Sequence, residues 1–227
     1  MTRDIDFSTE RAYGDFDSEK FRRDMDRGLL TAIDSLPYGL ACRVQSWEVR
    51  PPKPDATFQT LIARIGYAPR IDTRRMRRFQ GPHGSLTKLD LEISFNERLY
   101  AIEMIGDGNV DAIPAYALTE LVGEKFRAIL QQPIRNRIRR QDSLDIYLLL
   151  HRPELHSTVA KIQVLQILKI KCESRNTLAS RESMRDIEVR RCSQKEYPKL
   201  ADEIDFELPD FDMVFDAVTH YYESLPW

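Results

Sequence analysis

The main change in the period of the hydrophobic pattern lies near residue 116, between a strand-rich first half and a helical second half. Before that point apolar and polar residues alternate in several segments, as on a strand with one buried face, most clearly in LTKLDLEISF at 86–95. After it apolar residues recur about every 3.6 positions, which is the repeat of a helix with one buried face. Strands followed by helices predict an α+β fold, with an α/β lobe over residues 1–115 and a helical bundle over 116–227.

The strand-rich half contains four candidate strands, at 3–7, 40–49, 57–67 and 86–95. The core-facing side of the last strand is predicted to hold Leu89, Leu91, Ile93 and Phe95. One helix is expected in this half, capped by Asp17. Its apolar stripe is formed by Phe21, Met25, Leu29, Ile33 and Leu36. A turn is expected in GDGN at 106–109.

The second half contains five candidate helices. They are expected at 119–132, 139–151, 158–173, 181–190 and 210–224. Pro133 is predicted to end the first of them, because proline lacks the N–H that a helix interior needs. The third is expected to bury Val159, Ile162, Leu165 and Leu168. The last is expected to bury Phe211, Val214, Phe215, Val218, Tyr221 and Tyr222.

The composition is that of a globular protein in water. Hydrophobic residues make up 42% of the 227 positions and charged residues 31%, so the chain has enough apolar material for a core. The longest stretch without a charged residue spans nine positions, 79–87, whereas a membrane helix needs about 20. MTRDIDF has no apolar signal region, which predicts a cytoplasmic location. Three distant cysteines argue against both a disulfide framework and a zinc site.

The charge is distributed unevenly. Residues 200–227 carry eight acids and no Lys or Arg, so the total of -2 leaves +6 on the first 199 residues. Arginines cluster in TRRMRR at 73–78 and in RNRIRR at 135–140. Such clusters could bind phosphates, or they could form a solvated face that the acidic stretch balances.

Two acids share one face of the first strand. Asp4 and Asp6 are two residues apart, opposite Ile5 and Phe7, and could hold a hard cation such as Mg²⁺. Asp90, on the polar face of the strand at 86–95, could supply a third carboxylate. Acids with this spacing are also common on solvated strand faces, so both interpretations stay open.

Charged residues also fall on apolar helix faces. Lys125 shares its face with Leu118, Leu121, Val122 and Ile129. It could bind an anion, or extend along the apolar surface with its ammonium group in water. Asp142 and Asp145 begin a helix that becomes fully apolar, and could satisfy free backbone amides there. Asp145 lies on the face that continues to Leu148 and Leu149, which predicts a buried cationic partner.

Several enzyme classes leave no signature in the chain. The sequence has no Walker loop, no dinucleotide-binding fingerprint and no serine hydrolase motif. Its nine glycines leave little room for a glycine-rich phosphate loop.

Four segments resemble, in order and spacing, the motifs of the AbiEii/AbiGii toxin nucleotidyltransferase family. They are TRDIDFS at 2–8, TKLDLEISF at 87–95, YALTELVGEKFRAIL at 116–130 and RRQDSLDIYLLL at 139–150. The family is related to DNA polymerase β-like nucleotidyltransferases and to the MenT toxins, which add nucleotides to tRNA ends. The resemblance implies a nucleotidyltransferase-like mixed-sheet lobe followed by a helical bundle.

The resemblance also implies roles for individual residues. Asp4 and Asp6 would bind Mg²⁺, and Asp90 would be the third metal-binding acid, placed to activate an attacking hydroxyl. Lys125, with Arg139 nearby, would neutralise the phosphates of the NTP. Asp142 and Asp145 would complete the helical wall of the catalytic cleft.

The chain departs from the family pattern at two places. Gln141 stands where the family usually has Lys or Arg, and the family's Gly-Ser or Gly-Gly segment would lie before residue 1. We therefore expect Ile5 and Phe7 to be partly exposed, with either a longer natural chain or a dimer contact covering them.

Three functions follow from these patterns. The first is a toxin that transfers NMP from an NTP to an RNA, such as tRNA, or to a protein acceptor, with a cognate antitoxin as partner, no membrane association and a possible homodimer. The second is a catalytically impaired relative, shortened at its N-terminus, that binds nucleotide or a partner. The third is a non-enzymatic adaptor that binds nucleic acid through its arginine clusters.

Overall fold

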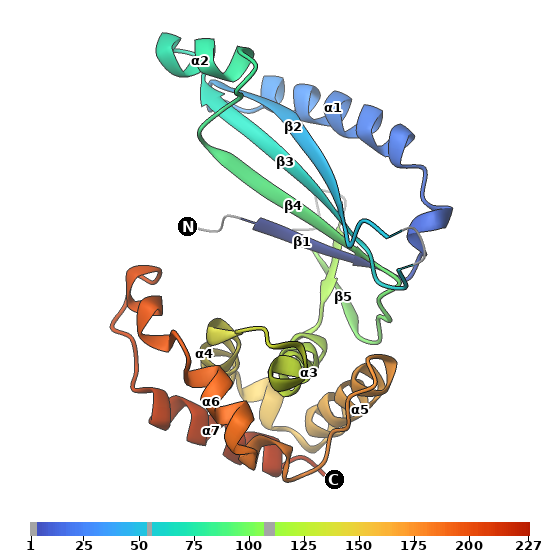
Figure 1. Cartoon of the computed structure of the whole chain (residues 1–227), viewed down its shortest axis with the longest axis vertical. Coiled ribbons are helices and arrows are strands. Elements are labelled where there is room, and N and C mark those ends of the chain that lie inside the picture. Colours follow the sequence, from blue (N-terminus) through green and yellow to red (C-terminus); the bar gives the residue numbers. More distant parts are fainter. Residues whose placement is uncertain (1–3, 54–55, 107–111) are drawn as a thin grey trace. The chain divides into compact units, whose positions relative to one another are not determined.

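The computed structural model describes residues 4–53, 56–106 and 112–227 (Figure 1). The chain divides into two compact units, an N-terminal unit at Met1–Leu99 and a C-terminal unit at Tyr100–Trp227. The expected α+β class is confirmed, since a four-stranded sheet belongs to the first unit and the long helices of the bundle to the second.

The N-terminal unit is built on one mixed sheet. Its strands are β1 (Asp4–Thr9), β2 (Leu40–Arg50), β3 (Thr60–Pro69) and β4 (Lys88–Phe95), in the order β1-β4-β3-β2. β1 runs parallel to β4, whereas β4 with β3 and β3 with β2 are antiparallel. All four expected strands are present.

Helix α1 (Ser18–Ser35) packs on β2, as Figure 1 shows. The Asp17 side chain caps it, as expected, by accepting a hydrogen bond from Lys20 N at 2.8 Å. The expected stripe is half-buried from Phe21 to Ile33, and the Phe21 ring meets Trp47 edge-on. Leu36 does not belong to the stripe, because it lies beyond the last helical residue and is exposed.

Strand β1 forms one edge of this sheet. Ile5 and Phe7 are 42% and 44% exposed, which confirms that these two side chains are partly open. α1 packs on β2, at the opposite edge of the sheet.

The TRRMRR segment forms a helix that the sequence analysis did not predict. Helix α2 (Thr73–Gln80) follows β3 and is capped by Asp72, which accepts a hydrogen bond from Arg75 N at 2.9 Å. Phe79 is its buried residue, and its four arginines are exposed.

The C-terminal unit begins with a hairpin that the sequence analysis also missed, and continues with helices. The strands are β5 (Ile102–Ile105) and β6 (Ile113–Tyr116). The helices are α3 (Leu118–Arg135), α4 (Arg140–Leu149), α5 (Thr158–Ser174), α6 (Ile187–Gln194) and α7 (Phe211–Glu223). Short 3-10 turns lie at Tyr13–Asp15, Pro153–His156, Ser183–Arg185 and Tyr197–Asp202. Residues 107–109 of the expected turn lie outside the described residues.

The core of the C-terminal unit forms around α7. All six residues of its expected stripe are buried, and Asp210 caps the helix through Asp212 N and Met213 N. The expected stripe of α5 is wrong at Val159 and Ile162, which are exposed, while Ala160 and Val164 are buried instead. α5 is apolar on more than one side, so its spacing alone does not determine the buried face.

Pro133 does not end its helix, contrary to the expectation. α3 continues to Arg135 and ends at Asn136, which has a left-handed conformation with φ of 48°. The buried Gln132 side chain hydrogen-bonds Ser193 Oγ and Arg139 N, each at 2.8 Å. These tertiary contacts hold the last turn despite the hydrogen bond that a proline removes.

The sequence argued against a membrane helix and against a disulfide framework. In the described part of the chain, every helix is too short or too polar to cross a bilayer. The three cysteines are free thiols.

Candidate active site

The parallel pairing of β1 with β4 brings the predicted strand acids together. Asp4 is the Cα partner of Asp90, and Asp6 is the Cα partner of Glu92. Residues paired across neighbouring strands share a face, as do residues two apart on one strand. Asp6, Asp90 and Glu92 therefore lie on the polar face of the sheet; the side chain of Asp4 is outside the described part.

Glu92 was missed as a site residue by the sequence analysis. Its only signal was its position two residues after Asp90 on a strand with clear alternation. The pairing partner that makes it relevant, Asp6, is 86 positions away along the chain. Only the strand register reveals that juxtaposition.

Arg64 on β3 connects this acidic region to β2. Its Nε lies 3.5 Å from Asp90 Oδ2, and its Nη2 lies 3.3 Å from Glu48 Oε2. Glu48 also accepts a hydrogen bond from Arg50 Nε at 2.7 Å, which is the main cause that lowers the pKa of Glu48. Asp90 thus faces a fixed cation in the free protein.

The donor chemistry of this face fits a magnesium ion. Within the part of the chain that is described, no three His, Cys, Asp or Glu side chains are grouped closely enough to hold a metal by themselves. Mg²⁺ commonly uses one or two carboxylates together with substrate phosphates and water. Asp6, Asp90 and Glu92 supply carboxylate oxygens from neighbouring positions, so they suit such a shared coordination.

The C-terminal unit brings the other predicted residues into one cluster. Lys125 Nζ on α3 lies 2.6 Å from Asp145 Oδ2 and 3.3 Å from Asp142 Oδ1, both on α4. Arg139 Nε lies 4.0 Å from Asp142 Oδ2. The prediction that Asp145 has a cationic partner is confirmed, and Lys125 is a fixed ion-pair partner rather than a lysine extended into water.

Burial within this cluster differs from the expectation. The side chain of Asp142 is 9% exposed and that of Asp145 41%, so Asp142 is the buried acid. The face of α4 that enters the core holds Leu144 and Ile146, whereas Leu148 is 41% exposed. Position along a short helix did not predict this face, because every residue from Ile146 to Leu150 is apolar or aromatic.

Electrostatics keep Lys125 charged. Burial by itself would lower its pKa, but the charges of Asp142 and Asp145 outweigh burial and raise the pKa of Lys125. Burial raises the pKa of Asp142, against the effect of Lys125 and Arg139. Burial also lowers the pKa of Arg139. Asp142 Oδ2 is buried and has no hydrogen-bond donor among the described residues.

Gln141, where the family usually has a cation, points to another partner. Its Nε2 donates to Glu203 Oε2 at 3.1 Å, and the neighbouring Arg140 pairs with Glu196 and Glu203. The acids near the end of the chain thus bind the start of α4.

Comparison with known proteins bears on the family of the chain. No curated protein matches the chain. The family model for the nucleotidyl transferase AbiEii toxin of type IV toxin-antitoxin systems matches residues 1–217, which include every predicted site residue. The chain therefore belongs to the AbiEii family of nucleotidyltransferase toxins.

Proposed function

We propose that this chain is a magnesium-dependent nucleotidyltransferase that transfers NMP from an NTP to a hydroxyl group of an acceptor. It would act as the toxin of a toxin-antitoxin pair in the cytoplasm, in a role such as phage defence, with its cognate antitoxin as partner. The observation that carries the proposal is the register of β1 on β4, which pairs Asp4 with Asp90 and Asp6 with Glu92.

The proposed reaction is an in-line displacement at the α-phosphorus. The acceptor oxygen forms a bond to that phosphorus, the α–β phosphoanhydride bond breaks, and pyrophosphate leaves. Asp90 accepts the hydroxyl proton, and Arg64 positions its carboxylate. Asp4, Asp6 and Asp90 would hold Mg²⁺, with Glu92 beside Asp6 as a further carboxylate, and the ion when bound would supply positive charge to the phosphates. Lys125 and Arg139 are proposed to bind the phosphates as well, with Asp142 and Asp145 fixing Lys125.

A second candidate is a chain that binds nucleotide without transferring it. The observation that favours it is the engagement of Lys125 with two carboxylates, because a triphosphate must compete with them. Titration calorimetry with Mg²⁺ and each NTP, beside a transfer assay, separates binding from transfer.

The proposal is tested by incubating the full chain with Mg²⁺, each α-labelled NTP, and total cell RNA and protein. We expect label in one fraction, and Asp6→Asn should abolish it while leaving the melting temperature unchanged or higher, because carboxylate repulsion is relieved. Asp26→Asn on α1, an exposed acid outside the sheet, is the matched control. An unaltered transfer rate in Asp6→Asn would refute the metal mechanism.

A further inference from the structure

A pocket of about 480 Å³ lies at the end of the N-terminal sheet where β2 begins, β3 ends and β4 begins. Its size is within the range of small-molecule sites. It is lined by Arg43, Val44, Gln45, Ser46, Gln80, Gly81, Pro82, His83, Gly84 and Lys88. Arg43 and Lys88 are the charged side chains of this lining and none of its residues is acidic, so the pocket favours an anion.

Arg43 is oriented by Phe79, and Lys88 has no ion-pair partner in the described structure. Arg43 Nη2 donates to Phe79 O at 2.5 Å, and its guanidinium lies 5.0 Å from the centre of the Phe79 ring. Its other N–H groups remain for a ligand, since a guanidinium carries five. Lys88 is exposed, and the described residues contain no ion-pair partner for it.

The positive charge continues beyond the pocket onto α2. Residues 73–88 contain four arginines and one lysine but no acid. Figure 1 shows α2 at this end of the sheet. Arg75 pairs with Asp72, whereas Arg74, Arg77 and Arg78 are exposed and have no salt bridge to any described residue. A row of separate cations suits a chain of phosphates better than a single phosphate group.

The strand register links the pocket to the acidic region. Arg43, Gly66 and Lys88 are partners across β2, β3 and β4, and the next row on this face contains Arg64 and Asp90. Lys88 and Asp90 are two residues apart, or roughly 7 Å along the strand. A polymer whose phosphates lie on Lys88 and α2 can therefore present its terminal hydroxyl to Asp90.

Gln45 gives the pocket a polar group without a partner. It is the extra residue of a bulge between Val44 and Ser46, and its amide packs against Gly66 and Gly84. A Cβ at Gly84 would lie 2.6 Å from Gln45 Oε1. Both amide atoms are buried and lack a hydrogen-bond partner in the described structure. Gln45 lines the pocket, and its amide would contact a bound nucleobase only after it moves away from the two glycines.

We infer that this pocket and α2 form the binding surface for a single-stranded RNA end, which is the acceptor of the transfer. The binding of RNA is independent of the proposed function, whereas the role of that RNA as acceptor rests on it. Arg43, Lys88 and the α2 arginines bind the phosphates, and the pocket holds one nucleotide beside Gln45.

The inference is tested with the full chain and a fluorescein-labelled single-stranded RNA of about 12 nucleotides, without NTP, by fluorescence anisotropy. Arg43→Gln with Lys88→Gln should lower the affinity roughly tenfold. The slope of log K against log salt concentration should become shallower by about 0.7 for each lost phosphate contact. Because Arg43 also bonds Phe79, Lys88→Gln and Arg77→Gln/Arg78→Gln are measured separately, with melting temperatures.

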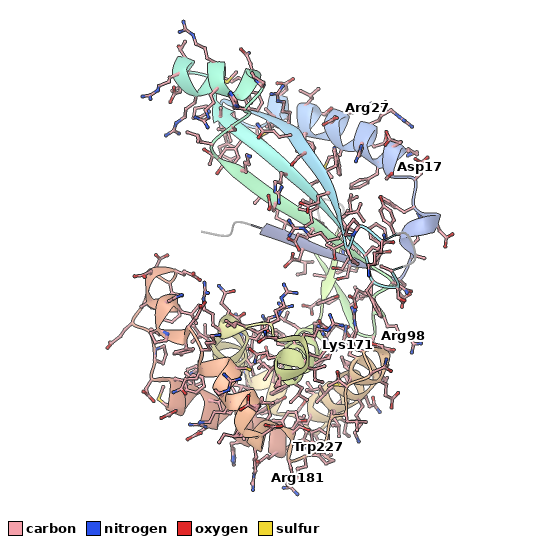
Figure 2. The ribbon with its side chains drawn as sticks, viewed as in Figure 1. Asp17, Arg27, Arg98, Lys171, Arg181 and Trp227 are labelled. Atoms are coloured by element: carbon pink, nitrogen blue, oxygen red, sulfur yellow. The ribbon has the colours of Figure 1, made fainter. Side chains whose placement is uncertain are left out.

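The matched control is Arg23→Gln/Arg27→Gln, two exposed arginines of α1 (Figure 2 labels Arg27). It should leave both affinity and slope unchanged. Wild-type affinity and slope in all pocket and α2 variants would overturn the inference, as would a labelled protein acceptor together with no binding of the RNA.

The two proposals can fail separately. If the variants lose RNA binding but the wild type transfers no nucleotide in any fraction, the RNA surface stands and the proposed transfer is refuted. If the pocket variants label RNA at the wild-type rate, the transfer stands and the surface is refuted.

Discussion

The basic segment at 73–88 of the N-terminal unit differs from the paired arginines of the C-terminal unit. In the N-terminal unit, Arg74, Arg77, Arg78 and Lys88 are exposed and without a salt bridge to any described residue. In the C-terminal unit, arginines pair with acids near the end of the same unit, as Arg140 does with Glu203, Arg190 with Asp212 and Asp216, and Arg185 with Glu223. Of the two arginine clusters, the one at 135–140 is therefore partly neutralised within its own unit. Which cations a ligand can reach depends on pairing, not on their number.

The most buried charges lie in the C-terminal unit. Lys171 on α5 reaches toward α3 (Figure 2). Its Nζ lies 2.7 Å from Glu120 Oε1 and 3.4 Å from Glu124 Oε2. The side chains of Lys171 and Glu120 are 4% and 0% exposed. Burial by itself would lower the pKa of Lys171, but Glu124 and Glu120 outweigh it and raise the pKa.

The largest predicted effect is the loss of this lysine. Lys171→Met leaves Glu120 buried without its cation, so the free energy of unfolding should fall by about 3–5 kcal/mol, measured by urea denaturation. Lys199→Met removes an exposed pair with Glu196 and should cost less than about 1 kcal/mol. The double variant Lys171→Met/Glu120→Gln should recover much of the loss. Equal losses for Lys171→Met and Lys199→Met would show that burial does not separate these pairs.

A smaller loss is expected at the candidate site. Lys125→Met leaves Asp142 buried with only Arg139 nearby, and should cost roughly 2 kcal/mol near neutral pH. NTP affinity should also fall in calorimetry if Lys125 binds phosphate. Unchanged NTP affinity in the folded variant would remove that role from Lys125.

The stability loss in Lys125→Met should depend on pH. Burial raises the pKa of Asp142, so the folded state of the variant binds a proton more readily than the unfolded state does. The stability difference between the variant and the wild type should therefore shrink as the pH falls toward the ordinary pKa of an aspartate. It should grow again as the pH rises. A constant difference between pH 4 and pH 7 would contradict this account. Asp142→Asn in the same background should remove the pH dependence.

The smallest effect is expected in the N-terminal unit and has the opposite sign. Gln45→Met keeps nearly the same volume and removes a buried amide without a partner, so it should raise the free energy of unfolding by about 1 kcal/mol. A shift in the urea midpoint measures it. RNA affinity should fall in the same variant, because methionine lacks the polar amide of a residue that lines the pocket. A loss of stability would mean that the amide has a structural partner such as a buried water.

Much of the fold could be predicted because its signals are local. Alternation in LTKLDLEISF predicted β4, the Asp17 cap marked the start of α1, and an apolar stripe predicted α7. The expectation failed where distant contacts override local preference. Gln132 holds the turn around Pro133 through Ser193, 61 positions away along the sequence. The α2 helix was not predicted, because it has four arginines and only one buried residue, Phe79, and therefore shows no apolar repeat.

For the candidate site, the sequence by itself determined which residues carry charge and which face of each strand they occupy. It singled out Asp6, Asp90, Lys125 and Asp142 from spacing and from resemblance to a family that the chain proves to belong to. Only the tertiary structure decided their neighbours: Glu92 beside Asp6, Arg64 against Asp90, and Lys125 between two acids of α4. The physical reason is that periodicity is set by backbone geometry over a few residues, whereas strand register and ion pairing depend on how segments far apart in sequence pack together.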